Sequence, residues 1–227
     1  MLVKNWMSKN VITLGVNDSL PTAAKLQKQY SIRALPVLEK NALVGIVTSG
    51  DIKRASASDA TSLGIHELLY LTGKILVKGI MTKEPVTVLP SMGIVEVAQI
   101  LLKHKINSVP VINEDKRLIG IITQSDIFKV LISLNGSEMR GIDFCFQIQD
   151  YPGSIKEVTD IIRSHSGRIA SILSNYEKAP AGYRNVYIHV FQTDRQNFKS
   201  LKEALLVETK VIYILDYLEE TQEIFET

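Results

Sequence analysis

The stretch that decides the fold is LVGIVTSGD at residues 43–51, which returns as LIGIITQSD at residues 118–126. In each copy a short apolar run ends in a threonine, Thr48 or Thr123, and an aspartate follows three residues later. The residues after each aspartate favour a helix, so a hydroxyl and a carboxylate meet where a strand passes into a helix. Two such pairs predict two related polar pockets rather than one catalytic centre.

The two copies belong to a longer internal repeat. Residues 7–14 match residues 81–88, and residues 32–37 match residues 106–111, each pair 74 positions apart. The Thr/Asp motif follows at a separation of 75, because the second copy has one more residue in the polar turn at 113–116. Turns accept insertions more readily than strands or helices do. Each copy therefore predicts the order β-α-β-β-α.

A third module follows the repeats. Residues 136–141 are rich in glycine and polar side chains, which favours a linker. Residues 142–149 then alternate apolar and polar side chains as a half-buried strand does, and a turn at 150–154 precedes a helix. The pattern beyond it completes the order β-α-β-β-α-β. The predicted fold class is α+β, with repeats at 1–60 and 79–135, a connecting helix and linker at 61–78, and the third module at 141–227.

Composition limits the classes of function. The 227 residues include 45% apolar and 22% charged side chains, with a formal charge of +2. These values are ordinary for a globular protein and argue against a nucleic-acid partner. No run approaches the length of a membrane span, no secretory leader opens the chain, and Cys145 is the single cysteine. We therefore predict a cytoplasmic protein without a membrane partner.

The sequence does not indicate catalysis. Its four histidines are scattered and have no metal-ligand spacing,. Cys145 alternates within a predicted strand, where a packed thiol is more common than a nucleophile. The sequence contains neither a glycine-rich phosphate loop nor a nucleophile-elbow motif,. We predict no enzymatic activity, no catalytic residue and no metal.

On these residues and their spacing, the first 135 residues resemble a tandem pair of CBS (cystathionine β-synthase-type) domains, together called a Bateman module. The pattern Gly-h-h-Thr-x-x-Asp, in which h is apolar, is matched at Gly45–Asp51 and at Gly120–Asp126. The module after residue 141 is similar to an ACT domain, which is ferredoxin-like, in its element order and its Asp-x-Pro-Gly-Ser turn. The combination also resembles the bacterial acetoin-utilisation AcuB type, and the segment Tyr70–Gly73 fits that resemblance.

The CBS resemblance implies clefts between the repeats that bind AMP, ADP, ATP or S-adenosylmethionine as a regulatory ligand. A carboxylate can accept hydrogen bonds from the ribose cis-diol, and a threonine hydroxyl can complete the set. By the resemblance, the Thr and Asp of one repeat face strand residues of the other. Pocket one then contains Thr123, Asp126, Asn10, Ile12, Ile32, Arg33 and Ala34, and pocket two contains Thr48, Asp51, Val86, Ile106, Asn107 and Ser108.

The two predicted pockets differ at one matching position. Arg33 can hold a phosphate through two parallel hydrogen bonds, whereas Asn107 in the equivalent place cannot. Pocket one is therefore predicted to be the tighter site, and Lys53 and Lys129 are candidates to assist. The alternative is that each motif is an ordinary helix N-cap, in which the side-chain oxygens satisfy free backbone N–H groups.

For the third module the ACT resemblance implies amino-acid binding near Asp150, Gly153 and Ser154. Glycine permits close approach of the backbone, and the following helix N-terminus favours a carboxylate. The alternative is that Pro152 and Gly153 only make the turn. The favoured function is a regulatory homodimer that senses a nucleotide and signals to a protein partner, in acetoin or related carbon metabolism. The alternatives are a structural homodimerisation module that senses nothing and, last, an enzyme with an unrecognised site.

Overall fold

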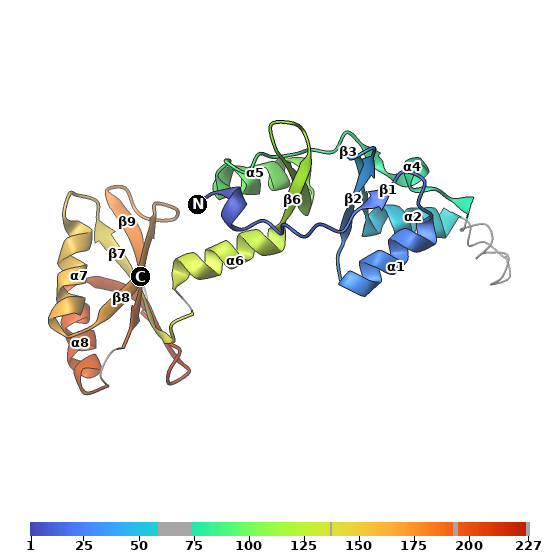
Figure 1. The fold of residues 1–227 in the computed structure, drawn as a ribbon. Coiled ribbons are helices and arrows are strands. Elements are labelled where there is room, and N and C mark those ends of the chain that lie inside the picture. Colours follow the sequence, from blue (N-terminus) through green and yellow to red (C-terminus); the bar gives the residue numbers. More distant parts are fainter. Residues whose placement is uncertain (59–73, 137, 193–194, 226–227) are drawn as a thin grey trace. The chain divides into compact units, whose positions relative to one another are not determined.

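The computed structural model describes residues 1–58, 74–136, 138–192 and 195–225, which divide into two units at 1–128 and 129–227 (Figure 1). The first unit contains both sequence repeats up to residue 128, and the second contains the last residues of the second repeat and the third module. Most of the predicted connecting helix and linker, including the segment Tyr70–Gly73, lies outside the described residues.

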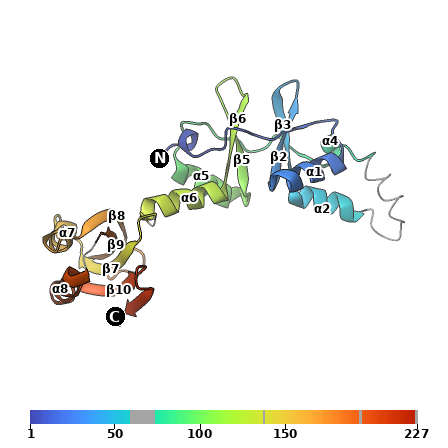
Figure 2. The ribbon, with the colours of Figure 1, turned by 60° about the horizontal axis from the view of Figure 1, so that its bottom comes forward.

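The first repeat is a small sheet with two helices on one side (Figure 2). Ser19 caps α1 by accepting a hydrogen bond from the backbone N–H of Thr22 at 3.3 Å, and Pro21 lies in its first turn, as helix-start chemistry predicts,. β1 pairs with β2 in parallel and β2 with β3 antiparallel. The elements are β1 (Leu14–Gly15), α1 (Leu20–Tyr30), β2 (Ala34–Glu39), β3 (Ala42–Thr48) and α2 (Ser49–Ser58).

The second repeat has the same plan, and its hairpin of β5 and β6 lies beside the hairpin of β2 and β3 in the first repeat (Figure 2). The counterpart of β1 is reduced to a single parallel bridge between Val88 and Val111. Both hairpins have a register shift at the same place, after Val37 in one and Val111 in the other. The elements are α5 (Ile94–His104), β5 (Ser108–Ile112), β6 (Leu118–Thr123) and α6 (Gln124–Asn135).

Each repeat is completed by the segment that leads into the other repeat. β4 (Thr82–Lys83) pairs with β3 of the first repeat, while Ser8 pairs with Ile121 of β6 through backbone hydrogen bonds of 2.9 and 3.0 Å. Just before these strands, α4 (Val77–Ile80) adds its first residue to the core of the first repeat. The short helix η1 (Val3–Asn5) bonds to the loop that precedes α5. This exchange joins the repeats into one unit.

The exchange explains the glycine of each motif. A Cβ atom at Gly45 would lie 2.5 Å from the sulfur of Met81 and 3.0 Å from the next carbonyl oxygen. A Cβ atom at Gly120 would lie 2.6 Å from the sulfur of Met7 and 3.1 Å from the next carbonyl oxygen. Both positions need glycine because the exchanged segment crosses directly over the strand.

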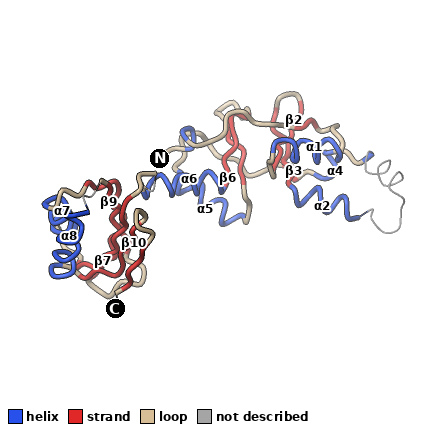
Figure 3. Tube along the Cα trace, turned by 90° about the horizontal axis from the view of Figure 1, so that it is seen from below, coloured by secondary structure: helices blue, strands red, loops and turns tan. Residues whose placement is uncertain are grey.

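The second unit is a five-stranded antiparallel sheet whose one face is covered by two helices (Figure 3). Its strand order is β11-β10-β7-β9-β8, which is a split βαβ arrangement with one added edge strand. Phe144 and Phe146 of β7 lie in the core with Ile162 and Leu201 of the helices. The elements are β7 (Gly141–Gln149), α7 (Ser154–Ser164), β8 (Arg168–Asn175), β9 (Tyr183–Phe191), α8 (Arg195–Glu208), β10 (Lys210–Asp216) and β11 (Thr221–Ile224).

From β7 to β10 the second unit has the predicted order β-α-β-β-α-β, and β11 follows as an additional strand that the sequence did not predict. All four residues of β11 are exposed. A strand with no buried face has no apolar alternation by which to be predicted.

Candidate functional site

Each Thr/Asp pair forms a reciprocal helix cap. The backbone N–H and the hydroxyl of Thr48 both donate to Oδ2 of Asp51, at 2.7 and 2.6 Å, and the Asp51 N–H donates back to the hydroxyl oxygen at 3.4 Å. Thr123 and Asp126 make the same three bonds at 3.0, 2.7 and 3.3 Å. Both aspartates are buried, with 7% and 5% of their surface exposed. The Thr/Asp pair therefore caps the N-terminus of the following helix in both repeats.

The cap gives the threonine a positioning role. Each threonine hydroxyl donates its proton to the aspartate, and its oxygen accepts from the aspartate N–H. Oδ2 of each aspartate already accepts two hydrogen bonds from the threonine, which fill both of its lone pairs. A further donor, such as a ribose hydroxyl, must therefore bond to Oδ1.

In the first repeat Oδ1 has a partner within the chain. The guanidinium of Arg54 donates to Oδ1 of Asp51, from a side chain that is 76% exposed. Exposed pairs of this kind contribute little to stability, so a ligand can displace the arginine at low cost. Arg54 contacts Asp51 because a helix brings residues i and i+3 together, and the assisting role of Lys53 stays a prediction. Lys129 has the equivalent i+3 position after Asp126.

The strand ladders place each motif beside the entering strand of its own repeat. Thr48 lies opposite Ala34, and Ser49 donates its backbone N–H to the carbonyl oxygen of Arg33 at 3.0 Å. In the second repeat, Thr123 lies opposite Ser108, and Gln124 donates its backbone N–H to the carbonyl oxygen of Asn107 at 2.9 Å. These bonds lie within each repeat. The pairing of each Thr/Asp pair with strand residues of the opposite repeat stays a prediction.

The other predicted pocket residues differ in exposure. Asn10, Arg33 and Asn107 are exposed, and Val86 and Ile106 are half-buried. Ile12 and Ile32 pack against the core of the first repeat. Among the described residues, the Arg33 side chain has no ion pair, so its guanidinium can meet an anion without breaking a contact.

A cavity of about 380 Å³ lies between the two hairpins of the first unit. Its lining includes no residue of the two predicted pockets. The lining residues are Lys9, Val11, Thr13, Leu38, Asn41, Arg117, Leu118 and Ile119.

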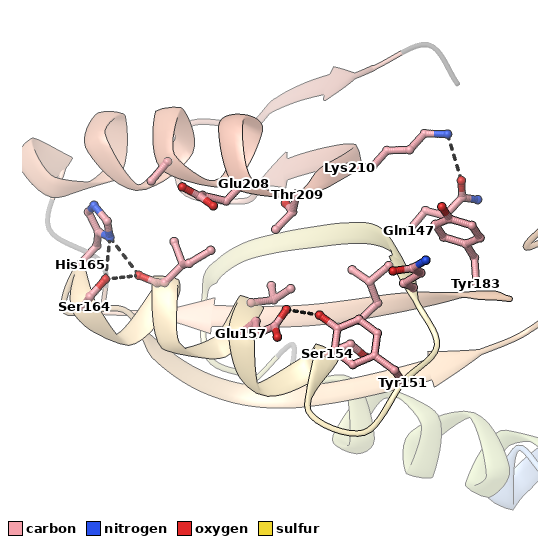
Figure 4. A pocket seen from close by; sticks show the side chains of 15 residues that line it. Gln147, Tyr151, Ser154, Glu157, Ser164, His165, Tyr183, Glu208, Thr209 and Lys210 are labelled. Atoms are coloured by element: carbon pink, nitrogen blue, oxygen red, sulfur yellow. Dashed lines mark hydrogen bonds between the residues drawn. The ribbon is translucent and has the colours of Figure 1, made fainter.

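In the second unit, a groove of about 700 Å³ lies between α7 and α8 (Figure 4). Tyr151 donates to Glu157 along one wall, and Lys210 donates to Gln147 at 2.9 Å on the other side. Ser154, one of the three predicted ACT ligand residues, lines this groove and is buried.

The other two predicted ACT residues have structural roles. Asp150 lies 3.2 Å from Nε of Arg184, and the same guanidinium donates to Ser154 at 3.2 Å. Gly153 has a φ of 103°, and a Cβ there would meet nothing within 4 Å. Backbone conformation alone therefore explains this glycine, as the turn alternative requires.

His189 and Cys145 are both buried and held in structural contacts. His189 is 2% exposed, and its ring nitrogens lie 2.5 Å from a carboxylate oxygen of Asp143 and 2.5 Å from the carbonyl oxygen of Met139. Burial raises the pKa of the Cys145 thiol to about 11, against an opposing hydrogen bond with Tyr213. Across the described ranges, His, Cys, Asp and Glu side chains form no group of three that could hold a metal. Within the same ranges, no helix is both long and apolar enough to cross a membrane.

Comparison with known proteins covers the repeats. The family model named CBS domain matches residues 3–58 and 77–133. A CBS domain-containing protein of Dictyostelium discoideum is 32% identical over 135 residues, which is 59% of this chain and 93% of that protein. An inosine-5'-monophosphate dehydrogenase of Korarchaeum cryptofilum is 35% identical over 125 residues, but the match spans 55% of this chain and only 23% of that enzyme. The relatives that are enzymes thus share a CBS region with this chain, which supports the prediction that it is not an enzyme.

Two solved structures match over nearly their whole length. The CBS domain pair of protein MJ0100, in complex with 5'-methylthioadenosine and S-adenosyl-L-methionine, is 32% identical with a TM-score of 0.50, over 58% of this chain and 95% of that one. A Vibrio cholerae protein assigned to acetoin utilization (AcuB) is 30% identical with a TM-score of 0.50, over 59% of this chain and 92% of that one. The repeat prediction is confirmed, and the chain belongs to the CBS-domain family, with two CBS domains in tandem.

Proposed function

We propose that this protein is a regulatory sensor that binds an adenosine-containing ligand between its two CBS repeats. The observation that carries the proposal is the pair of buried carboxylates, Asp51 and Asp126, each fixed by its threonine through one oxygen. A carboxylate held in this way is preorganised to accept the ribose hydroxyls through Oδ1. The relative MJ0100, whose CBS pair was solved with two adenosine derivatives, supports this class of ligand.

The rest of the ligand would meet the residues predicted from the resemblance. Half-buried Ile12 and Ile32 offer an apolar wall for the adenine, and Arg33 offers a cation for a phosphate,. Asn107 replaces that cation in the other pocket. This difference favours the Asp126 pocket for AMP, ADP or ATP.

Homodimerisation is the second part of the proposal. On α5, Val95 and Leu102 lie two turns apart on one face, and each is 73% exposed,. On α6, Phe128 and Leu131 are 60% and 59% exposed. Apolar side chains exposed to this degree favour a protein interface. A ligand that binds one arrangement of the repeats more tightly would shift the population of that arrangement and so change the surface offered to a regulated partner.

We also propose that the second unit provides a second ligand site, for an amino acid. Its element and strand order are those expected of an ACT-like domain,. An amino acid at the β7–α7 turn would have to compete with Asp150 for Arg184. The similarity to the AcuB protein supports acetoin or related carbon metabolism as the setting, and a cytoplasmic location remains part of the proposal.

The test is titration of the wild-type chain and two variants with AMP, ADP, ATP and S-adenosylmethionine by calorimetry and thermal shift. Asp126→Asn and Asp51→Asn keep an acceptor for the cap but remove the charge. We expect a nucleotide to raise the melting temperature of the wild type and to bind about tenfold more weakly to Asp126→Asn. Asp51→Asn should have the smaller effect.

A structural dimerisation module is the alternative that the observations also support, because the caps alone explain the Thr/Asp motifs. It predicts no thermal shift with any of these ligands at millimolar concentration, together with a stable dimer. That combination would replace the sensor proposal.

A further inference from the structure

The cavity between the hairpins lies at the opposite end of the strands from the Thr/Asp motifs. Asn41 directly precedes β3, and Thr48 is its last residue. The seven residues of β3 separate the two ends by about 20 Å. The cavity is therefore distinct from the proposed adenosine pockets.

The segment after η1 contributes to both regions. Lys9, Val11 and Thr13 line the cavity. Ile12 instead packs against the core of the first repeat. The cavity thus excludes Ile12, which belongs to the predicted adenosine pocket.

The lining of the cavity is basic. It contains two cations, Lys9 and Arg117, and two neutral donors, the hydroxyl of Thr13 and the amide of Asn41, while its other members are apolar. None of the eight lining residues is acidic. In the described part of the chain, neither cationic side chain is in an ion pair. A volume of about 380 Å³ falls within the range of small-molecule sites.

We propose that this cavity binds a small phosphate-bearing anion, at a site separate from the adenosine pockets. Arg117 would hold two phosphate oxygens at once, and Lys9 would act as a point charge from the other wall. Because the cavity is built from both hairpins and the crossing segment, a bound anion would tie the two repeats together. The anion would therefore be a second ligand, besides the adenosine compound, that changes the angle between the two repeats.

The test is calorimetric titration of the full chain with inorganic phosphate and with pyrophosphate. The matched control uses the sequence repeat: Lys83 is the equivalent of Lys9, but the equivalent of Arg117 is Ala42. We expect pyrophosphate to bind more tightly than phosphate, and added salt to weaken both. Lys9→Gln with Arg117→Gln should weaken binding by about tenfold or more, and each single variant should give part of that loss. Lys83→Gln should bind as the wild type does.

A second control separates this site from the adenosine pockets. The variant Arg33→Gln, which removes the cation predicted to hold a nucleotide phosphate, should bind pyrophosphate with the wild-type affinity. Loss of affinity there would place the anion at the Thr/Asp end and overturn the proposal. Absence of binding to the wild type at millimolar anion, or an equal loss in Lys83→Gln, would also overturn it. Thermal melts of each variant confirm that a loss of binding is not a loss of folding.

Discussion

Replacing Gly45 by alanine should destabilise the first unit, because the segment exchange leaves no room for a side chain there. The new Cβ would lie 2.5 Å from the sulfur of Met81 and 3.0 Å from a backbone carbonyl oxygen. The Met81 side chain is packed against the core of the first repeat, and the carbonyl belongs to β4, which is paired to the same strand. Overpacking of this kind costs about 1–3 kcal/mol of unfolding free energy.

The assay is urea unfolding of the full chain, with Gly50→Ala as the matched control. A Cβ at Gly50 would have its nearest neighbours at 3.5 Å, an ordinary contact. Because Gly50 lies in α2, alanine there should be neutral or stabilise by up to about 1 kcal/mol. The variant Met81→Ala provides room for the new methyl group. Gly45→Ala should therefore cost less in the Met81→Ala background, with a coupling of about 0.5–3 kcal/mol.

Two results would refute this reasoning. One is an unfolding free energy for Gly45→Ala that is equal to that of Gly50→Ala. The other is strict additivity of Gly45→Ala and Met81→Ala. Either would mean that the crossing segment does not lie against β3 in solution, and that the glycine of the motif has another cause.

Three further predictions concern the rest of the chain. Burial opposes ionisation of Asp216, but hydrogen bonds from Arg195 and from two backbone N–H groups outweigh it and hold its pKa below the ordinary value. The stability from this group is present above about pH 3.9, the unfolded value, and is lost as the pH falls towards the folded value. Asp216→Asn should flatten that acid limb of stability against pH, and an unchanged limb would contradict the assignment. Because burial raises the pKa of Cys145 to about 11, a thiol reagent at neutral pH should label it only after urea unfolding, and rapid labelling of the native chain would be inconsistent with burial. Leu102→Glu should convert a dimer to a monomer in sedimentation velocity if the α5 face is the interface, whereas unchanged sedimentation of a dimer would place the interface elsewhere.

Local pattern predicted the elements of both units well. Apolar periodicity, the Ser19 cap and the repeat itself are properties of neighbouring residues, so the sequence contains them directly. The Thr/Asp motif was located correctly for the same reason, and the N-cap alternative is the geometry observed. Arg54 was missed although the i, i+3 rule for helices was sufficient to find it.

Long-range pairing could not be predicted in the same way. The match between residues 7–14 and 81–88 shows that two segments are equivalent, but both would fit either sheet equally well. Only the three-dimensional structure shows that each joins the opposite repeat. The basic cavity was missed for a related reason, since Lys9 and Arg117 lie far apart in the sequence and neither belongs to a motif. The edge strand β11 has no buried face and hence no pattern.

In the proposed function, Asp126 holds the ribose of an adenosine ligand. The direct test compares AMP with its 2',3'-dideoxy analogue, on the wild type and on Asp126→Asn, by calorimetry. Hydrogen bonds to a charged acceptor contribute about 1.5–3 kcal/mol each, so the wild type should prefer AMP by about tenfold or more. The Asn variant should lose most of that preference while it keeps the cap. Equal preference for AMP in both proteins, or no preference in the wild type, would contradict the claim.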